Sequence, residues 1–167
     1  GDAFEETWAD SQNLVSEHQS LLFLPSDLAV EVDGKRMNIG IEDLPTKYPI
    51  YDIGLDTMMR MRPLIMEANC LLWNGPASYF EKSEFAQGTV EIMNMFTEAQ
   101  GVTIVGGGHT SALFNQRGKA GEVSHNSTGG GSVLTMLSGG TMPVFDSLER
   151  SYEKFRPLLR SLGMSKE

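Results

Sequence analysis

Short apolar runs alternate with longer amphipathic segments along most of the chain. The apolar runs have the length of buried strands and lie at Leu21–Leu24, Ile50–Ile53, Cys70–Trp73, Val102–Val105 and Val123–His125. Helical spacing or composition predicts helices over Asp56–Ala68, Ser83–Ala99, Thr110–Arg117, Gly130–Leu137 and Ser147–Leu162, with Asp56, Ser83 and Asp146 as N-cap candidates. This β-α-β-α order predicts an α/β fold: a three-layer, Rossmann-like parallel sheet with helices on both faces and right-handed crossovers.

One stretch departs from the alternation. Ala29–Val32 and Lys35–Ile39 flank the dipeptide Asp33-Gly34, which is typical of a tight hairpin turn. We therefore expect a small hairpin on the edge of the sheet.

The composition fits one ordinary domain, since 167 residues with 40% hydrophobic content can close a core. The formal charge of 13 − 22 = −9 excludes a basic footprint for nucleic acid or an anionic membrane, but leaves a local basic pocket for a phosphate ligand open. Cys70 is the single cysteine, so no intrachain disulfide forms, and its apolar setting predicts a buried small side chain. Without an apolar span or the features of a signal peptide, a cytoplasmic chain is expected.

Glycine-bearing loops follow three of the predicted strands. Their sequences are Trp73-Asn74-Gly75-Pro76, Gly106-Gly107-Gly108-His109-Thr110 and Ser127-Thr128-Gly129-Gly130-Gly131-Ser132. In a parallel sheet such loops open at one edge, where glycine lets the backbone approach a ligand and the next helix offers unpaired N–H groups. A single loop of this kind is usually a tight turn that helix packing requires, but three together favour a phosphate cradle.

Few side chains near these loops suggest other chemistry. Neither the P-loop nor the common dinucleotide fingerprint is present. His109 has no second ligand at metal spacing, so it is interpreted as a helix-start side chain, and no metal ligand is assigned. His125 is expected to be structural. Glu81 could accept hydrogen bonds from a ribose, and a solvated loop glutamate is the alternative.

Six segments in series carry a resemblance to a known family: LLFLPSDLAVEV, YDIGLDT, LLWNGPASYFEKSEFAQGT, TIVGGGHTSA, VSHNSTGGGS and LERSYEKF. Their order and spacing resemble phosphoglycerate kinase, particularly its archaeal branch, from about Leu21 to Phe155. The resemblance implies phosphoryl transfer between 1,3-bisphosphoglycerate and ADP, giving 3-phosphoglycerate and ATP in glycolysis, with Mg²⁺ bound to the nucleotide. It also implies that residues 1–167 are the C-terminal part of the nucleotide-binding lobe, without the N-terminal substrate lobe and an early lysine-bearing loop.

The same resemblance assigns site residues. Asn74 and Pro76 would line the nucleotide phosphate and base region, and Glu81 would bind the ribose. The nucleotide-phosphate loop would consist of Gly107, Gly108, His109 and Thr110, and Gly129, Gly130 and Gly131 would stabilise the transferring phosphoryl group, so Gly107 and Gly130 are the catalytic candidates.

Two departures from the family pattern bear on this assignment. His109 stands where many members have an aspartate that helps to hold Mg²⁺; imidazole is a poor Mg²⁺ ligand, so the metal would rest on phosphates and waters. Ala77-Ser78-Tyr79 replaces smaller, more apolar residues.

The expected partners are ADP or ATP, 3-phosphoglycerate through the missing lobe, and a second copy through an exposed sheet edge; nucleic acid and membrane are not expected. The 167-residue chain alone is expected to show no kinase turnover.

Overall fold

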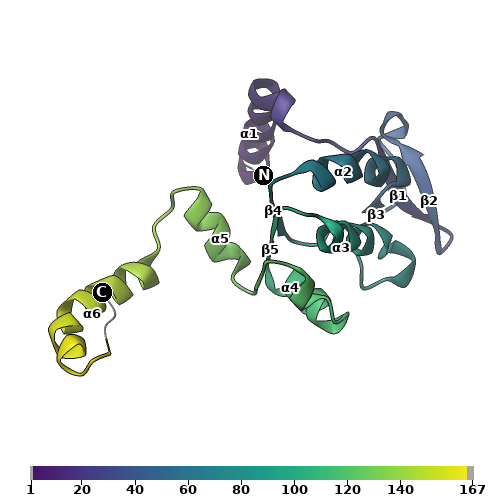
Figure 1. Cartoon of the computed structure of the whole chain (residues 1–167). Coiled ribbons are helices and arrows are strands. Elements are labelled where there is room, and N and C mark those ends of the chain that lie inside the picture. The colour runs from purple at the N-terminus through teal and green to yellow at the C-terminus, as the bar shows by residue number, and fades with distance from the viewer. Residues whose placement is uncertain (1, 165–167) are drawn as a thin grey trace. The chain divides into compact units, whose positions relative to one another are not determined.

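The computed structural model describes residues 2–164, which divide into two compact units (Figure 1). The first unit runs up to Leu71 and includes Pro76–Val102; the second comprises Leu72–Gly75 and the chain from Thr103 onward.

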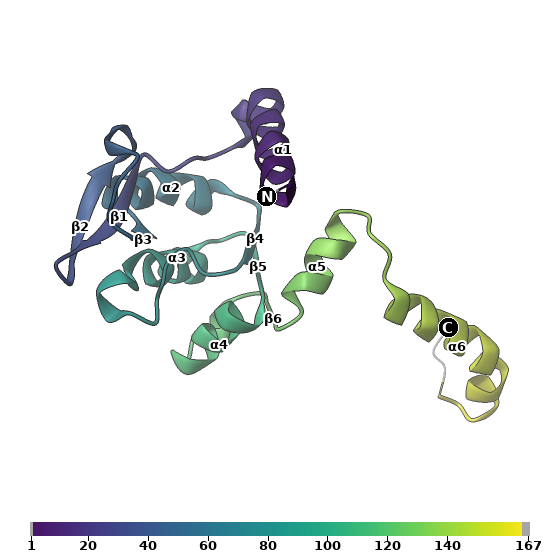
Figure 2. The same cartoon turned by 180° about the vertical axis from the view of Figure 1, so that it is seen from behind.

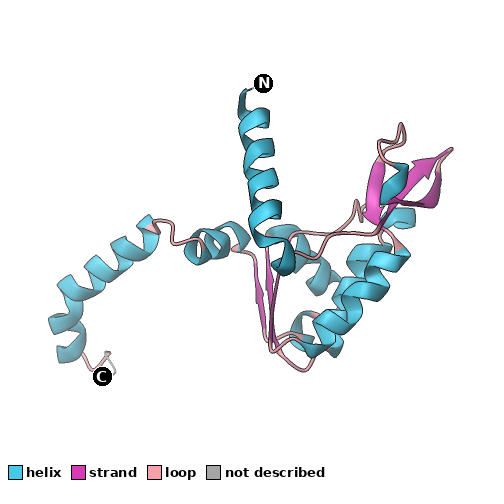
Figure 3. Ribbon diagram, turned by 90° about the horizontal axis from the view of Figure 1, so that it is seen from above, coloured by secondary structure: helices cyan, strands magenta, loops and turns pink. Residues whose placement is uncertain are grey.

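The first unit contains an antiparallel sheet in the order β2-β1-β3 (magenta in Figure 3). Strands β1 (Asp27–Val32) and β2 (Lys35–Gly40) form the predicted hairpin, with Val32 opposite Lys35. Asp33 and Gly34 both have positive φ, 49° and 75°, as a two-residue turn between twisted strands requires.

The third strand of this sheet corrects a prediction. β3 (Ile50–Ile53) pairs antiparallel with β1, whereas the sequence pattern placed it in the parallel sheet with the hairpin at that sheet's edge. Only Asp52 of β3 is buried, and its carboxylate needs the partner that Arg36 on β2 supplies. The apolar run Ile50–Ile53 thus forms the β3 edge of a small antiparallel sheet that is separate from the parallel one.

Two helices cover this sheet and form the main core of the unit. α2 (Leu55–Glu67) and α3 (Gln87–Glu98) contact each other, α2 contacts β1, and α3 contacts β3. The predicted helix over Ser83–Ala99 is split, because Ser83–Phe85 forms a separate 3-10 turn before α3. The buried apolar residues here are Ala29, Val30, Met58, Ile65, Phe85, Ile92, Met93, Met95 and Phe96.

α2 is capped by a side chain from the sheet and not by a residue of its own. Asp27 accepts hydrogen bonds from the backbone N–H of Asp56 at 3.0 Å and of Thr57 at 2.7 Å, and from the Thr57 hydroxyl at 2.6 Å. Burial acts to raise the Asp27 pKa, but these hydrogen bonds outweigh it and lower the pKa below its usual value. A Cβ at Gly54 would lie 2.1 Å from the Asp27 carboxylate, so glycine gives this cap its space.

The second sheet has the order β4-β5-β6 (labels in Figures 1 and 2). Its strands are β4 (Cys70–Asn74), β5 (Val102–Gly106) and β6 (His125–Ser127), and β5 and β6 pair in parallel with Gly106 opposite Ser127. In the second unit Trp73 packs edge-on against Phe114, with ring centroids 5.6 Å apart. The predicted α/β class with parallel strands is confirmed.

The helices of the second unit agree closely with the prediction. α4 (Gly108–Gln116) begins two residues before the expected Thr110, and α5 (Gly130–Leu137) has the expected bounds. α6 (Pro143–Ser161) begins four residues before the expected Ser147, with proline at its first position, where the missing N–H is no loss. None of the N-cap candidates Asp56, Ser83 and Asp146 caps a helix.

Three further expectations were wrong. Leu21–Leu24 is no strand: a 3-10 turn (Gln19–Leu21) is followed by extended chain before Pro25, which cannot donate to a sheet. Cys70 is exposed and not buried. The last strand lies at β6 and not at Val123–His125.

The pattern also gave no indication of α1 (Asp2–His18). Two short 3-10 turns, Ile41–Asp43 and Ala120–Glu122, complete the elements of residues 2–164. No helix in this range is long and apolar enough to cross a membrane.

Candidate functional site

Two glycine loops leave neighbouring strand ends in the second unit. The parallel register sets Gly106 of β5 beside Ser127 of β6, so Gly107–Thr110 and Thr128–Gly131 start at one edge. Gly107 has φ 97° and ψ 138°, a conformation that side-chain-bearing residues rarely adopt. The expectation that these loops share a sheet edge is confirmed.

Gly130 lies directly against the first loop. A Cβ at Gly130 would be 2.5 Å from the Gly107 nitrogen, 2.6 Å from its Cα and 2.2 Å from Asn74 Oδ1. Asn74 Oδ1 also lies 3.3 Å from the Cβ positions of Gly106 and Gly107. The end of β4 and both loops therefore meet. This contact leaves no room for a side chain at Gly130, and the positive φ disfavours one at Gly107.

Both loops lead into helix N-termini without side-chain caps. α4 begins at Gly108 and α5 at Gly130, and no side-chain cap hydrogen bond is formed at either start. The first intrahelical donors are Ser111 N–H to Gly107 O and Val133 N–H to Gly129 O, each bond 2.9–3.0 Å long. The N–H groups of the preceding residues carry the partial positive charge of a helix start and suit an anion.

Thr110 provides a further donor. Its side chain is fully buried, and its Oγ1 has no hydrogen-bond partner among the described residues. A buried hydroxyl is normally paired, so an unpaired one beside two uncapped helix starts suits a ligand oxygen. Asn126 Oδ1 on β6 is likewise buried and unpaired, and sequence reasoning missed this residue because asparagine in a strand gives no signal of its own.

The remaining predicted residues of these loops are more open. His109 is exposed at the start of α4, consistent with the helix-start interpretation, and Gly108 and Gly131 have open space at their Cβ positions. Gly129 N–H donates to Ser127 Oγ at 3.1 Å, which fixes the second loop before α5.

Pro76 and Glu81 belong to the first unit, whereas the glycine loops belong to the second. Glu81 is exposed. Pro76 lines a cavity of about 320 Å³ with Tyr51, Ser78 and Tyr79, among others. The Tyr51 and Tyr79 rings lie 5.4 Å apart, and Tyr79 N–H donates to Tyr51 O at 2.7 Å. The segment after Asn74-Gly75-Pro76 is thus attached to β3.

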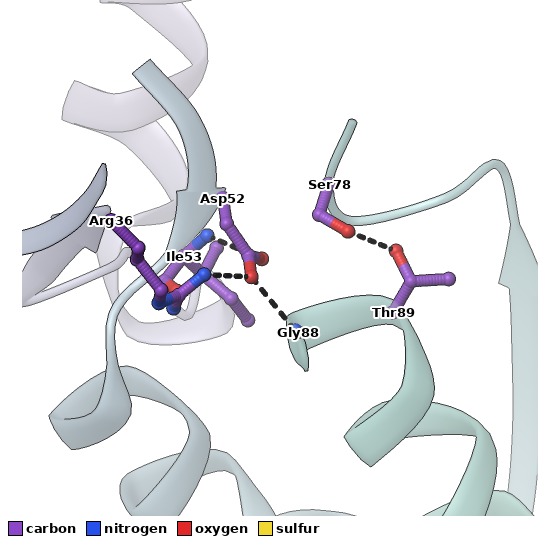
Figure 4. Close-up of polar contacts among 6 residues, drawn as sticks. All are labelled: Arg36, Asp52, Ile53, Ser78, Gly88 and Thr89. Atoms are coloured by element: carbon purple, nitrogen blue, oxygen red, sulfur yellow. Dashed lines mark hydrogen bonds and ion pairs between the residues drawn. The ribbon is translucent and has the colours of Figure 1, made fainter. Parts of the chain in front are cut away.

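A buried ion pair lies at the start of α3, the helix that also contacts this segment (Figure 4). Asp52 accepts from Arg36 Nη1 at 2.5 Å and from the Gly88 N–H at the start of α3 at 2.9 Å. Burial raises the Asp52 pKa, although the Gly88 N–H and Arg36 favour the charged form. In Figure 4 the Thr89 hydroxyl meets that of Ser78, 2.6 Å away, which joins the first turn of α3 to the Pro76–Tyr79 segment.

A magnesium site made by protein ligands does not fit the described residues. Among residues 2–164 no group of three or more His, Cys, Asp and Glu side chains is arranged to hold a metal ion. The candidate site consists of amides, hydroxyls and one imidazole, and Mg²⁺ prefers oxygen ligands.

Comparison with known proteins decides the family. The sequence profile of phosphoglycerate kinase matches residues 3–140. The chain belongs to the phosphoglycerate kinase family. The archaeal resemblance is confirmed as well: the chain is 38% identical over 153 residues to phosphoglycerate kinase of Thermococcus onnurineus and 35% identical over 147 residues to that of Methanococcus maripaludis.

The solved structures show the same fold. The crystal structure of phosphoglycerate kinase from Pyrococcus horikoshii OT3 matches 92% of the chain with a TM-score of 0.82 at 34% identity. The phosphoglycerate kinase of Coxiella burnetii matches 80% with a TM-score of 0.72 at 30% identity. These alignments cover 36% of each of the two archaeal sequences and 39% and 37% of the two solved chains, so this chain spans little more than a third of the length of its relatives.

Proposed function

We propose that this chain supplies the nucleotide-binding loops of an enzyme that transfers a phosphoryl group between 1,3-bisphosphoglycerate and ADP, giving 3-phosphoglycerate and ATP. The observation that carries the proposal is the contact of Gly107 with Gly130, which sets two uncapped helix starts side by side. Family membership supports the reaction type, since the relatives are named as phosphoglycerate kinases.

The loops suit the demands of phosphoryl transfer, which requires positioning and charge stabilisation more than covalent chemistry from the protein. In this proposal Gly107, Gly108, His109 and Thr110 hold the nucleotide phosphates, with the unpaired Thr110 hydroxyl donating to a phosphate oxygen. The amides of Gly129, Gly130 and Gly131 stabilise the transferring group.

Further contacts follow from the same assignment. Asn74, whose Oδ1 is close to both loops, lines the phosphate region. Pro76 borders the base, and the exposed Glu81 accepts hydrogen bonds from the ribose. Mg²⁺ would come with the nucleotide, held by its phosphates and by waters, and would supply neutralising charge.

We further propose that residues 1–167 form the C-terminal part of a nucleotide-binding lobe in a cytoplasmic, glycolytic enzyme. The 167-residue polypeptide by itself should bind nucleotide without turnover, because the relatives it matches are much longer and the second substrate needs the opposing lobe. A non-catalytic nucleotide-binding module is the second candidate, and self-association through an exposed sheet edge stays a prediction.

The first experiment is a calorimetric titration of the 167-residue chain with ADP, with and without Mg²⁺. Saturable binding supports preformed loops, and its absence would contradict the proposed phosphate site. A coupled assay for ATP formation from 1,3-bisphosphoglycerate then tests the expected lack of turnover by this chain. Turnover by this chain alone would refute the division of labour between lobes.

A further inference from the structure

A hydrogen bond between two hydroxyls joins the segment after Gly75 to helix α3 (Figure 4). Ser78 Oγ lies 2.6 Å from Thr89 Oγ1, and the Thr89 side chain is fully buried. A hydroxyl enclosed in this way needs a partner, because burial removes its hydrogen bonds to water. Among residues 2–164 the Thr89 hydroxyl is paired by Ser78 alone, so moving Ser78 away would leave a buried group unpaired.

The Thr89 end of this contact is fixed by the small antiparallel sheet. Thr89 is the third residue of α3, and the N–H of the neighbouring Gly88 donates to Asp52 Oδ2 at 2.9 Å. Asp52 lies on β3, where it is buried and pairs with Arg36. A buried carboxylate holds such donors strongly, because losing one leaves charge without compensation. The first turn of α3 is therefore a firm point of attachment.

The Ser78 end belongs to a segment that is attached a second time. The next residue, Tyr79, donates its N–H to Tyr51 O at 2.7 Å, and the two tyrosine rings lie 5.4 Å apart. Tyr51 directly precedes Asp52, so both attachments of the segment lead to one short strand, β3. Side-chain and backbone contacts thus hold two consecutive residues of the segment.

The segment leads into the turn that contains Glu81. Lys82 N–H donates to Tyr79 O at 3.1 Å, which closes a β-turn with Phe80 and Glu81 as its central residues. The Glu81 side chain is exposed. Because the first residue of this turn is the attached Tyr79, the position of Glu81 follows from the attachment of the segment before it.

We propose that Ser78 and Thr89 are a positioning pair for the nucleoside part of the nucleotide. This rests on the proposed function, which assigns Pro76 to the base and Glu81 to the ribose. The hydroxyl pair keeps the segment from Pro76 to Glu81 in its place before the nucleotide arrives, so ordering this segment does not reduce the affinity. The pair acts on the base and ribose, whereas the diphosphate belongs to the glycine loops.

The test compares ADP with pyrophosphate in calorimetric titrations of the 167-residue chain. Ser78→Ala and Thr89→Val each remove one hydroxyl of the pair. Each should raise the ADP dissociation constant about 2- to 10-fold, as expected for one net hydrogen bond, and change that of pyrophosphate by less than about twofold. Thr89→Ser keeps the hydroxyl and should bind ADP within about twofold of the wild type.

The double variant Ser78→Ala/Thr89→Val separates positioning from simple stabilisation. Removing one hydroxyl leaves the other without its partner, but removing both leaves no unpaired group. In urea unfolding the double variant should therefore lie closer to the wild type than Ser78→Ala does. Its ADP affinity should stay as low as that of the single variants, because the attachment is still missing.

Ser83→Ala is the matched control. It removes an exposed serine hydroxyl in the same unit, where Ser83 Oγ donates to Glu84 at 2.9 Å, and should leave the affinity for both ligands unchanged. Hydrogen exchange of the ligand-free chain tests the attachment without a nucleotide. Ser78→Ala should speed exchange of the Tyr79 and Lys82 amides about 2- to 10-fold, and Ser83→Ala should not.

The possible failures are distinguishable. If the wild type binds ADP and the variants bind it equally well, or if their ADP affinity merely follows their free energy of unfolding, the positioning pair is wrong and the proposed function stands. Unchanged exchange at both amides in Ser78→Ala would also overturn the pair. A wild type that binds neither ADP nor pyrophosphate would contradict the proposed function and, with it, the role of the pair in binding.

Discussion

Gly130→Ala tests the contact on which the proposed nucleotide site rests. The added methyl would lie 2.5 Å from the Gly107 nitrogen and 2.2 Å from Asn74 Oδ1. Ordinary van der Waals contact begins at 3.4 Å, so Gly107 must retreat by 3.4 − 2.5 = 0.9 Å unless the second loop moves instead. The Asn74 side chain can rotate away, but the Gly107 backbone is fixed at the end of β5.

The expected effects differ for stability and for binding. Overpacking costs about 1–3 kcal/mol, and alanine regains up to about 1 kcal/mol over glycine in a helix, so the free energy of unfolding should fall by about 0–3 kcal/mol. A displaced amide loses its hydrogen bond to a charged phosphate, which contributes about 1.5–3 kcal/mol. ADP affinity should therefore fall by about 10- to 100-fold.

Calorimetric titration with ADP and urea unfolding measure the two effects separately. Gly121→Ala is the control, because Gly121 lies in the same unit, has an ordinary φ and has nothing within 4 Å of its Cβ position. If Gly130→Ala binds ADP as well as Gly121→Ala does, the close approach of the two loops plays no part in phosphate binding, and the proposed site is wrong.

Three further predictions concern side chains. Thr110→Val should change the free energy of unfolding by less than about 0.5 kcal/mol, because the buried hydroxyl has no partner among the described residues to lose. It should nevertheless weaken ADP binding about tenfold. Equal effects on stability and on ADP binding would contradict the assignment of the Thr110 hydroxyl as a ligand donor. The lowered pKa of Asp27 stabilises the fold above the usual aspartate value of 3.8. The free energy of unfolding of the wild type should therefore drop as the pH falls below 3.8, and that of Asp27→Asn should drop less. Urea unfolding from about pH 5 down to about pH 2 measures the difference. Arg36→Ala should destabilise the fold by about 3–5 kcal/mol, because it leaves the buried Asp52 carboxylate without an opposite charge. Adding Asp52→Asn should recover part of this loss in chemical unfolding. No recovery would show that Arg36 acts through packing alone.

The predictions that the structure confirmed concern elements whose conformation depends on residues close together in the sequence. The Asp33-Gly34 turn fixes its own hairpin through two positive φ values, and the bounds of α5 follow from its glycine start and apolar composition. Leu21–Leu24 and Ile50–Ile53 look alike as apolar runs, yet one is extended chain and the other joins an antiparallel sheet. Pro25 marks the end of the first run, but the apolar runs themselves do not distinguish the two cases, because strand pairing depends on partners distant in sequence.

Helix capping illustrates the same limit. Asp56 and Ser83 stand where an N-cap is expected, but α2 and α3 receive their caps from Asp27 and Asp52 on the sheet, 29 and 36 residues away from the N–H groups they accept. Glycines at positions 54 and 88 make room for those carboxylates. Cys70 likewise sits in an apolar run and is exposed, since burial depends on what covers a strand.

By itself the sequence determined the α/β class, the strand-to-helix position of the glycine loops and, through its motifs in series, the phosphoglycerate kinase family. Backbone chemistry at glycine and the spacing of apolar side chains are properties of the chain, so they can be read without coordinates. Only the tertiary structure decided that Gly130 lies against Gly107 and that the Thr110 hydroxyl is buried without a partner among the described residues. These depend on which distant segments come into contact, and that is settled by packing of the whole chain.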